Sequence, residues 1–225
     1  MKKLKVTWDV IPDQYWKRNE EAYEFIQGVK LNTNRINMLD IVTKEMRKVR
    51  SLDVGCGRRG LGTAANIDIA YPPIVPMNFQ IMDAHHLTFP DNSFLAVSMI
   101  EVIEHLENPS QALRELYRVL EKGGNLFLTT PNPLHISVFI RYLRNKRIRL
   151  HCDHLHTWYW EMLAWLLHNI GFKDIEVYLW GYVEQMRREG IKVKCYRSYY
   201  LANLLYRWRF RNAMLSLNIF IKCRK

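Results

Sequence analysis

The sequence predicts an α/β protein built around a mostly parallel β-sheet. Strand-forming runs alternate with amphipathic helices, and the first strand runs directly into Gly55 and Gly57. Such alternation favours parallel strands joined by crossover connections. Glycines after a buried strand permit a sharp turn and let a ligand approach the backbone closely. The first strands are expected at 50–55, 65–70, 78–83, 94–100 and 125–130.

Helical periodicity marks the segments before and between these strands. Residues 13–46 carry apolar residues at helical spacing and are predicted to be helical. The clearest helix begins after Asn108, a favoured N-cap residue, with Pro109 at the first helical position. We expect Gly123 and Gly124 to end this helix, because glycine is favoured just past a helix C-terminus.

The rest of the chain continues the alternation. No internal repeat, low-complexity tract or interdomain linker is visible. A single domain covering residues 1–225 is therefore expected. Its later elements are predicted to be helices at 134–145, 158–170 (ending at Gly171) and near 196–212, and strands at 173–180 and 215–223.

Composition and cysteine usage indicate the compartment. Hydrophobic residues make up 48% of the 225 residues, which suffices for a core. No apolar run reaches the roughly 18 residues that span a bilayer. Asp9 and Pro12 interrupt the sequence after the basic N-terminus, which argues against a signal peptide. The four cysteines show no CxxC pairing, so a reduced, cytoplasmic chain is expected.

The net charge of +11 is concentrated in the last part of the chain. Residues 141–225 carry 17 Lys and Arg against 6 Asp and Glu, whereas residues 1–140 carry 16 of each. Nucleic acid, an anionic membrane surface and a phosphorylated substrate are the partners that such a basic region favours. A solvated basic surface without a partner is the alternative.

Glycines and acids at the strand ends predict a Rossmann-like nucleotide site. An open parallel sheet binds its ligand across the carboxyl ends of its strands. Gly55 and Gly57 follow the first strand, and Asp68, Asp83 and Glu101 lie at or near the ends of the next three. A carboxylate can accept hydrogen bonds from both hydroxyls of a ribose, and Asp68 is placed for this role. Asp83, followed by Ala84, is placed to accept a hydrogen bond from an adenine amine.

These motifs resemble the class I S-adenosylmethionine-dependent methyltransferases, of the methyltransferase type 11 kind. Asp53-x-Gly55-x-Gly57, Asp68, Asp83-Ala84 and the run from Glu101 to His105 occur in the family's order, and the match covers about residues 48–180. The resemblance implies a methyltransferase enzyme with S-adenosylmethionine as cofactor. It also implies a seven-stranded, mostly parallel sheet with an antiparallel last strand. The cofactor-binding residues that it implies are Asp53, Gly55, Cys56, Gly57, Asp68, Ile69, Asp83, Ala84 and Glu101.

Within the single domain this resemblance defines three regions. Residues 1–47 form an N-terminal helical region, residues 48–180 the cofactor-binding core, and residues 181–225 a basic substrate region with the last strand. Two features depart from the family pattern: Arg59 replaces the third motif glycine, and Asp68 follows Gly55 by only 13 residues. The first crossover helix is therefore expected to be short or absent. A nicotinamide-dependent enzyme is the weaker alternative, because hydride transfer does not explain the run from Glu101 to His105.

Two groups of residues are candidates for removing the acceptor's proton. Glu101, Glu104 and His105 have helical spacing, which would place them on one face. Downstream, His154 and His156 lie in a histidine-rich run. The predicted catalytic residues are therefore His154, His156, Glu104 and His105.

The same residues are candidates for a metal site. Glu-x-x-Glu-His also occurs in ubiquinone-pathway O-methyltransferases and small-RNA 2′-O-methyltransferases, where it ligates a divalent ion. This likeness makes Mg²⁺ a candidate second cofactor, with Glu101, Glu104, His105 and His154 as candidate ligands. Hydrogen-bonded structural roles for these residues are the alternative. Zinc is not expected, because no second Cys/His pair has ligand spacing.

The chemical class of the methyl acceptor is indicated by resemblance alone. The Pro131-Asn132-Pro133 turn and the run from Asp153 to Trp158 resemble methyltransferases of surface glycans and lipid-linked sugars, which implies O-methylation of a small-molecule, sugar or lipid-linked hydroxyl. A metal-dependent RNA 2′-O-methyltransferase is the alternative, so nucleic acid remains a candidate partner. A cofactor-binding regulatory subunit without turnover is a third hypothesis. For the basic aromatic segment 196–211, peripheral contact with an anionic membrane is one alternative, but its apolar stripe at helical spacing favours packing in the core, and its arginines favour contact with solvent or an anion.

Overall fold

The computed structural model describes residues 13–32, 38–58, 60–135, 153–180 and 218–225, with isolated positions at 138, 142 and 143. Its elements follow one another in the order α1 (Asp13–Gly28), β1 (Lys30–Asn32), α2 (Met38–Met46), β2 (Ser51–Val54), β3 (Ala65–Asp68), β4 (Phe79–Ile81), β5 (Phe94–Ile100), η2 (Ile103–His105), α3 (Pro109–Val119), β6 (Leu120–Pro131), α5 (Trp160–Ile170), β7 (Lys173–Trp180) and β8 (Asn218–Arg224).

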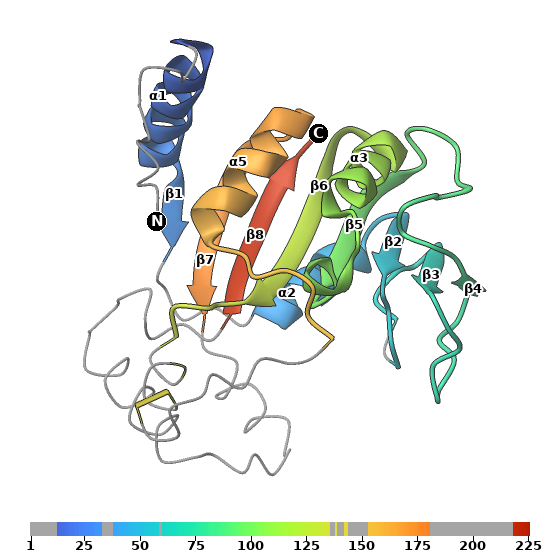
Figure 1. Cartoon of the computed structure of the whole chain (residues 1–225). Coiled ribbons are helices and arrows are strands. Elements are labelled where there is room, and N and C mark those ends of the chain that lie inside the picture. Colours follow the sequence, from blue (N-terminus) through green and yellow to red (C-terminus); the bar gives the residue numbers. More distant parts are fainter. Residues whose placement is uncertain are drawn as a thin grey trace, which may run out of the picture.

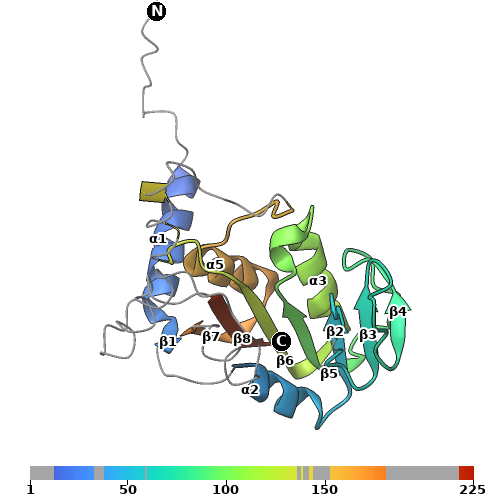
Figure 2. The same cartoon turned by 90° about the horizontal axis from the view of Figure 1, so that it is seen from below.

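The strands form a single sheet in the order β1-β7-β8-β6-β5-β2-β3-β4. Strands β4, β3, β2, β5 and β6 are parallel neighbours, and β8 is inserted antiparallel between β6 and β7. Helices cover both faces: α2 lies on one side and α3 and α5 lie on the other (Figures 1 and 2). The predicted fold class, with seven mostly parallel strands and an antiparallel last strand, is confirmed, and the short β1 adds an eighth strand beside β7.

Two element predictions are wrong in detail. Residues 13–46 do not form one helical region, because β1 at Lys30–Asn32 separates α1 from α2. Helix α3 does not end at Gly123 and Gly124: it ends at Val119, and Leu120 is already extended. Both glycines lie inside β6, where Leu120 and Asn125 pair with β5 on either side of an irregularity. The helices expected at 134–145 and 196–212 lie outside the continuously described residues.

The start of α3 follows the sequence prediction. The side chain of Asn108 accepts a hydrogen bond from the backbone N–H of Gln111, and Pro109 occupies the first turn, where its missing N–H costs nothing. Helix α5 likewise ends where expected, at Gly171, which has a φ of +121° and donates its N–H to the carbonyls of Leu167 and His168. Gly171 is suited to this role because its φ lies in a region that L-residues with a Cβ rarely adopt.

The core has two parts, one on each face of the sheet. The larger part joins the strands to α3 and α5 through residues such as Leu116, Leu126 and Leu167. The smaller part packs Val42 and Met46 of α2 against Phe127 and Phe220. Side chains alternate between the two faces along each strand, so a central strand covered by helices on both sides is apolar throughout. Strand β2 is buried at every position for this reason.

No helix of the described residues is long and apolar enough to cross a membrane.

Candidate active site

A cavity of about 570 Å³ opens between α2 and the carboxyl ends of the central strands. This volume is in the range of small-molecule and cofactor sites. The floor is formed by strand-end residues, including Asp53, Glu101, Thr129 and Asn218, and the wall by α2 and the β2–β3 connection. Four of the predicted cofactor residues line it together: Asp53, Gly55, Cys56 and Glu101.

The β2–β3 connection contains no helix in its described residues 55–58 and 60–64, as the short spacing from Gly55 to Asp68 predicted. Asp53 holds this connection in place: its Oδ2 accepts the Leu61 N–H at 2.9 Å, and its Oδ1 accepts the Ser98 hydroxyl. Gly55 adopts a φ of +67°, and a Cβ there would lie 2.2 Å from Cγ2 of Val102. Only glycine therefore fits this turn.

Burial gives Asp53 an unusual titration. Removal from water raises the pKa of this carboxyl to about 6, although the hydrogen bonds from Ser98 and Leu61 lower it. A raised pKa means that the folded state holds the proton more tightly than the unfolded chain does. The contribution of this group to the free energy of unfolding is therefore greatest at acidic pH and falls as the pH rises from about 4 to about 6.

We expect an Asp53→Asn variant to flatten this pH dependence. Asparagine can still accept the Leu61 N–H and donate to Ser98, so the loop contacts survive without the buried charge. The difference in unfolding free energy between pH 4 and pH 7 should shrink by about 2–3 kcal/mol. Urea unfolding of cofactor-free protein measures it, with Glu21→Gln on the exposed face of α1 as the control. An unchanged slope in Asp53→Asn would contradict the assignment.

Asp68 ends β3 beside the glycine turn. Its Oδ2 accepts the Gly57 N–H at 3.0 Å, and its Oδ1 accepts the Ile69 N–H at 2.8 Å. These bonds fix the side-chain carboxylate at the edge of the sheet where the parallel strands end. Each of its oxygens retains a further lone pair that can accept a hydrogen bond from a hydroxyl. The neighbouring Ile69 is exposed and presents an apolar side chain next to that carboxylate.

Replacing Asp68 should weaken cofactor binding about 10- to 100-fold, because a charge-assisted hydrogen bond contributes about 1.5–3 kcal/mol. Titration calorimetry of Asp68→Ala with S-adenosylhomocysteine measures the effect. Asp68→Asn should show a smaller loss, since it keeps one acceptor oxygen. Unchanged affinity in Asp68→Ala would remove this residue from the site, and Glu21→Ala serves as the charge-matched control.

Asp83 and Ala84 follow β4 at the same edge, next to a histidine. Oδ1 of Asp83 accepts the His85 N–H at 2.9 Å and lies 2.6 Å from Nδ1 of the same residue. These hydrogen bonds hold the pKa of Asp83 below its usual value. Ala84 is buried behind it. The carboxylate is thus kept ionised and oriented, as the predicted contact with an amine requires.

Glu101 does not share a helical face with Glu104 and His105. It has a φ of +56°, and the single 3₁₀ turn that follows contains only Ile103–His105. Its Oε1 accepts the Thr129 hydroxyl at 2.7 Å inside the cavity. Burial raises its pKa, while hydrogen bonds from Thr129 and Asn218 partly offset the shift. The expectation of one shared helical face is therefore wrong for Glu101.

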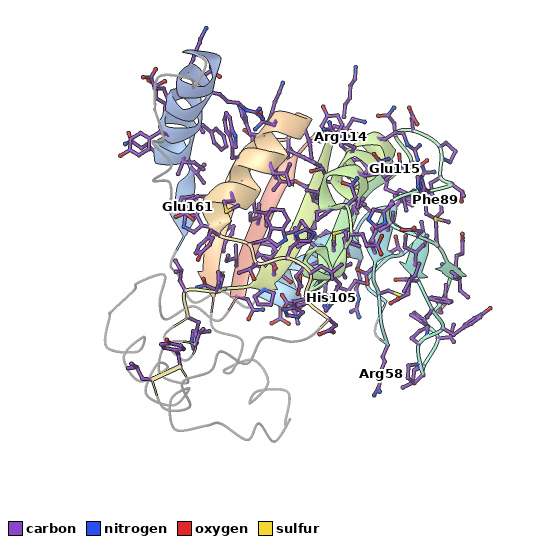
Figure 3. The ribbon with its side chains drawn as sticks, viewed as in Figure 1. Arg58, Phe89, His105, Arg114, Glu115 and Glu161 are labelled. Atoms are coloured by element: carbon purple, nitrogen blue, oxygen red, sulfur yellow. The ribbon has the colours of Figure 1, made fainter. Side chains whose placement is uncertain are left out.

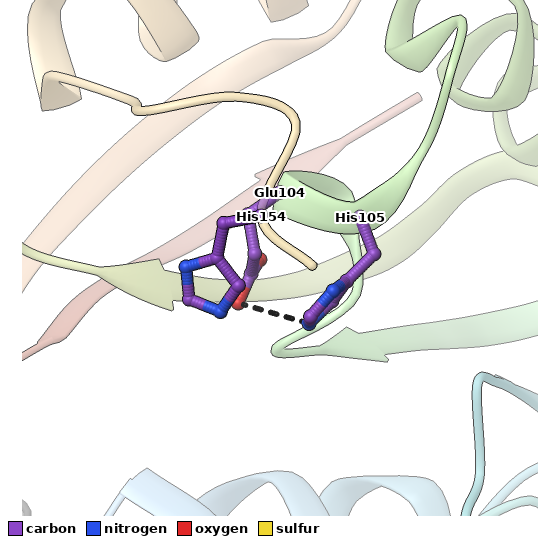
Figure 4. Close-up of side chains that lie close together, drawn as sticks. All are labelled: Glu104, His105 and His154. Carbon is purple, nitrogen blue, oxygen red and sulfur yellow. Dashed lines mark ion pairs between the residues drawn. The ribbon is translucent and has the colours of Figure 1, made fainter. Parts of the chain in front are cut away.

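Glu104, His105 and His154 do come together (Figure 4). Their potential ligand atoms all lie within 4.8 Å of one another, and the two imidazole rings meet edge to face at 4.7 Å. Oε2 of Glu104 accepts the Thr130 hydroxyl at 3.1 Å, whereas its buried Oε1 has no hydrogen-bond partner among the described residues. Oε1 lies 4.0 Å from Nε2 of His105.

Burial and the nearby charge of Glu101 raise the pKa of Glu104 to about 7. The Glu104 side chain is only 2% exposed, while that of His105 is 35% exposed and opens the cluster toward solvent. Figure 3 shows His105 below the centre of the sheet, on the side where the parallel strands end. The three residues thus form a group, here named the Glu-His cluster, which can accept a proton or hold an ion near the cofactor edge.

The remaining histidine of the predicted set plays a different part. His156 donates its backbone N–H to the carbonyl of Glu104 at 3.0 Å, and its ring lies 5.7 Å from that of Trp158. Leu155 donates to the same carbonyl at 2.8 Å. These two bonds attach the segment before α5 to the 3₁₀ turn and thereby bring His154 beside Glu104. Among the described residues the His156 ring does not join the Glu-His cluster.

Sequence reasoning missed several residues of the cavity. Thr129 and Asn218 hydrogen-bond Glu101 from β6 and β8, and α2 contributes Asp40 and Thr43 to the wall. Polar residues near the end of an otherwise apolar strand were the available signal for the first two. No such signal marked the α2 residues, because their helix is brought to the cavity only by packing against the sheet.

Comparisons with known proteins identify the family of this chain. A family model described as "Methyltransferase domain" matches residues 24–177, more than half of the chain. A demethylmenaquinone methyltransferase of Chlamydia trachomatis is 41% identical over 70 residues, covering 28% of this chain and 31% of that protein. A ubiquinone biosynthesis O-methyltransferase of Pseudomonas entomophila is 28% identical over 148 residues, covering 56% of this chain and 61% of that protein. The matches thus span less than two thirds of these relatives.

A solved structure shares the fold over nearly the whole chain. The S-adenosylmethionine-dependent methyltransferase from Archaeoglobus fulgidus superposes with a TM-score of 0.56 at 19% identity, covering 95% of this chain and 100% of that one. At this identity the likeness concerns the fold, while the family model covers both the glycine turn and the Glu-His cluster up to His154. The chain therefore belongs to the family of class I S-adenosylmethionine-dependent methyltransferases.

Proposed function

We propose that this protein transfers the methyl group of S-adenosylmethionine to a hydroxyl oxygen of a small acceptor, such as a sugar or a lipid-linked alcohol. The observation that carries the proposal is the Glu-His cluster: a buried carboxylate, with one oxygen lacking a hydrogen-bond partner among the described residues, beside two imidazoles at the cofactor edge. One relative is named a demethylmenaquinone methyltransferase, and another is named a ubiquinone biosynthesis O-methyltransferase.

The cofactor is assigned to the edge that holds Asp53, Gly55, Cys56, Gly57, Asp68, Ile69, Asp83, Ala84 and Glu101. In this arrangement Asp68 accepts hydrogen bonds from the ribose hydroxyls, and Asp83 accepts a hydrogen bond from the adenine amine. Glu101, with Thr129 beside it, faces the cavity. We further propose that residues 48–180 bind the cofactor, with residues 1–47 as the N-terminal region and residues 181–225 as the substrate side of one domain.

The chemical step is a displacement at the methyl carbon. The acceptor oxygen forms a bond to that carbon as the carbon–sulfur bond breaks, and the bonding electrons remain on sulfur, which becomes neutral. The hydroxyl proton passes to the Glu-His cluster. A base is most effective when its pKa lies near the working pH, and the raised pKa of Glu104, about 7, meets this condition. His154 and His105 lie within reach to share the proton.

The same residues fit a divalent metal ion. Glu104 offers a carboxylate oxygen, and His105 and His154 offer one nitrogen each within 4.8 Å. Ligands on opposite sides of an ion with bonds of about 2.1 Å are about 4.2 Å apart, so at most a small side-chain rotation is needed. A carboxylate with two imidazoles suits Mn²⁺ or Fe²⁺ better than Mg²⁺. When bound, such an ion would polarise an acceptor hydroxyl.

Turnover with isotopically labelled cofactor tests the function. Purified protein is incubated with labelled S-adenosylmethionine and separate pools of sugars, isoprenoid alcohols, phenols and short RNAs, and the products are identified by mass spectrometry. We expect label on an oxygen of a small acceptor, with equal release of S-adenosylhomocysteine. Label only on RNA 2′-oxygens, abolished by EDTA, would establish the RNA alternative. Cofactor binding without label transfer to any pool or to a cell extract would indicate a regulatory subunit.

A further inference from the structure

An uncharged apolar surface projects from the connection between β3 and β4. Residues 69–81 contain no charged side chain and three prolines. Besides Ile69, which lies next to Asp68, four of their large apolar side chains are between 54% and 84% exposed. This group, here named the β3–β4 patch, consists of Tyr71, Ile74, Val75 and Met77.

The backbone under this patch is tied to the rest of the fold. The carbonyl of Met77 accepts the Asn66 amide at 2.8 Å, and the Asn78 amide donates to the carbonyl of Thr63 at 3.0 Å. A Cβ on Gly60 would lie 2.4 Å from Cβ of Pro76, so this proline packs closely on the neighbouring loop. The apolar side chains therefore project from a fixed loop. Exposed apolar groupings of this kind mark protein or membrane interaction sites.

The patch lies on the side of the molecule where the parallel strands end. In Figure 1 the β3–β4 connection extends downward beyond the sheet, in the direction in which the arrow of β7 points. Arg58, on the adjoining β2–β3 connection, extends to the same side in Figure 3. The cavity and the Glu-His cluster open at this carboxyl edge as well.

The positive charge of the chain is concentrated in two segments that lie almost wholly outside the described residues. Residues 181–217 carry 8 Lys and Arg against 2 Glu, and residues 136–152 carry 5 basic residues and no acidic one. Together they account for the whole net charge of +11. The first of these segments leaves after Trp180 and returns at Asn218, which are paired in register, and Asn218 also pairs with Pro131, the last residue of β6.

We propose that the carboxyl edge docks on an anionic lipid bilayer, with the β3–β4 patch entering the membrane interface. Uncharged apolar and aromatic side chains are stabilised at the boundary between headgroups and acyl chains, and basic residues are attracted by anionic headgroups. A nucleic acid would account for the charge but not for the patch, because protein–nucleic acid interfaces are polar and positively charged. This docking does not depend on the acceptor or on methyl transfer.

Co-sedimentation with lipid vesicles tests the docking without any cofactor. We expect binding to vesicles with about 30% phosphatidylglycerol and little binding to pure phosphatidylcholine, because the attraction is electrostatic. Raising the salt from about 0.05 M to about 0.5 M should weaken it. The double variant Ile74→Ser/Met77→Ser should bind at least about tenfold more weakly, since its apolar contact is removed.

A matched control separates the patch from general loss of apolar surface. The double variant Tyr23→Ser/Met162→Ser removes two side chains that are 68% and 55% exposed on α1 and α5, and it should bind vesicles as the wild type does. Binding of S-adenosylhomocysteine should be unchanged in both double variants, which shows that they are folded and that failure of docking is distinct from failure of the proposed function.

Three results would overturn the proposal. The first is no sedimentation with anionic vesicles at low salt. The second is wild-type vesicle binding by Ile74→Ser/Met77→Ser. The third is a wild-type dimer, by light scattering, that this double variant dissociates while no form of the protein binds vesicles, which would assign the patch to a second copy of the chain.

Discussion

A Glu104→Gln variant should bind the cofactor normally and lose about 10²- to 10⁴-fold in the rate of methyl transfer, the usual contribution of a positioned base. Glutamine keeps the shape of the side chain and can still accept the Thr130 hydroxyl at 3.1 Å. It cannot take up the acceptor's proton, and its amide is a poor ligand for a cation. The single-turnover rate with labelled cofactor measures the effect, and calorimetry with S-adenosylhomocysteine shows that the site is intact.

Glu107→Gln is the matched control, because Glu107 is exposed and only three residues further along the chain. It should retain the wild-type rate. Repeating the assay with EDTA separates the two roles of the Glu-His cluster. A rate that falls with EDTA and recovers with Mn²⁺ indicates an ion, whereas a rate unaffected by EDTA but lost in Glu104→Gln indicates a base. Full activity of Glu104→Gln with EDTA present would show that the cluster is structural.

A Gly62→Ala variant should lose at least about 3 kcal/mol of unfolding free energy, in the range seen when a substitution forces backbone to shift. The added Cβ would lie 2.0 Å from the carbonyl oxygen of Ala65 and 2.8 Å from the amide nitrogen of Asp53. Both are backbone atoms of strands, so neither can move aside as a flexible side chain would. Urea unfolding measures the loss.

Substitutions at two other glycines provide comparisons for this loss of stability. Gly28→Ala adds a Cβ in open space and should change the free energy of unfolding by less than about 0.5 kcal/mol. Gly57→Ala also meets nothing within 4 Å but has a φ of +51°, so its loss should be about 1 kcal/mol. If Gly62→Ala were as stable as Gly28→Ala, the β2–β3 connection would have to follow another path.

The sequence by itself determined the fold and the edge at which the chemistry is placed. Alternating strand and helix patterns are local, and the rule that parallel strands collect their carboxyl ends on one edge needs no coordinates. Asp68 beside Gly57 and Asp83 beside Ala84 could therefore be placed from order alone. The short spacing from Gly55 to Asp68 correctly predicted that no helix would form between β2 and β3 in the described residues.

Local patterns failed where a segment's partner was distant in the chain. Spacing grouped Glu101 with Glu104 and His105, but a positive φ at Glu101 turns it toward Thr129, which is 28 residues away. No pattern in residues 30–32 predicted a strand, and they became one only because β7 offered an edge.

Only the tertiary structure decided which of the candidate residues meet. The histidine-rich run supplied two equivalent candidates, and the backbone bonds from Leu155 and His156 to the Glu104 carbonyl place His154 in the cluster and the His156 ring near Trp158. Sequence spacing fixes which face of an element a side chain occupies. Which distant side chain it meets depends on how the elements pack, and packing is a property of the whole chain.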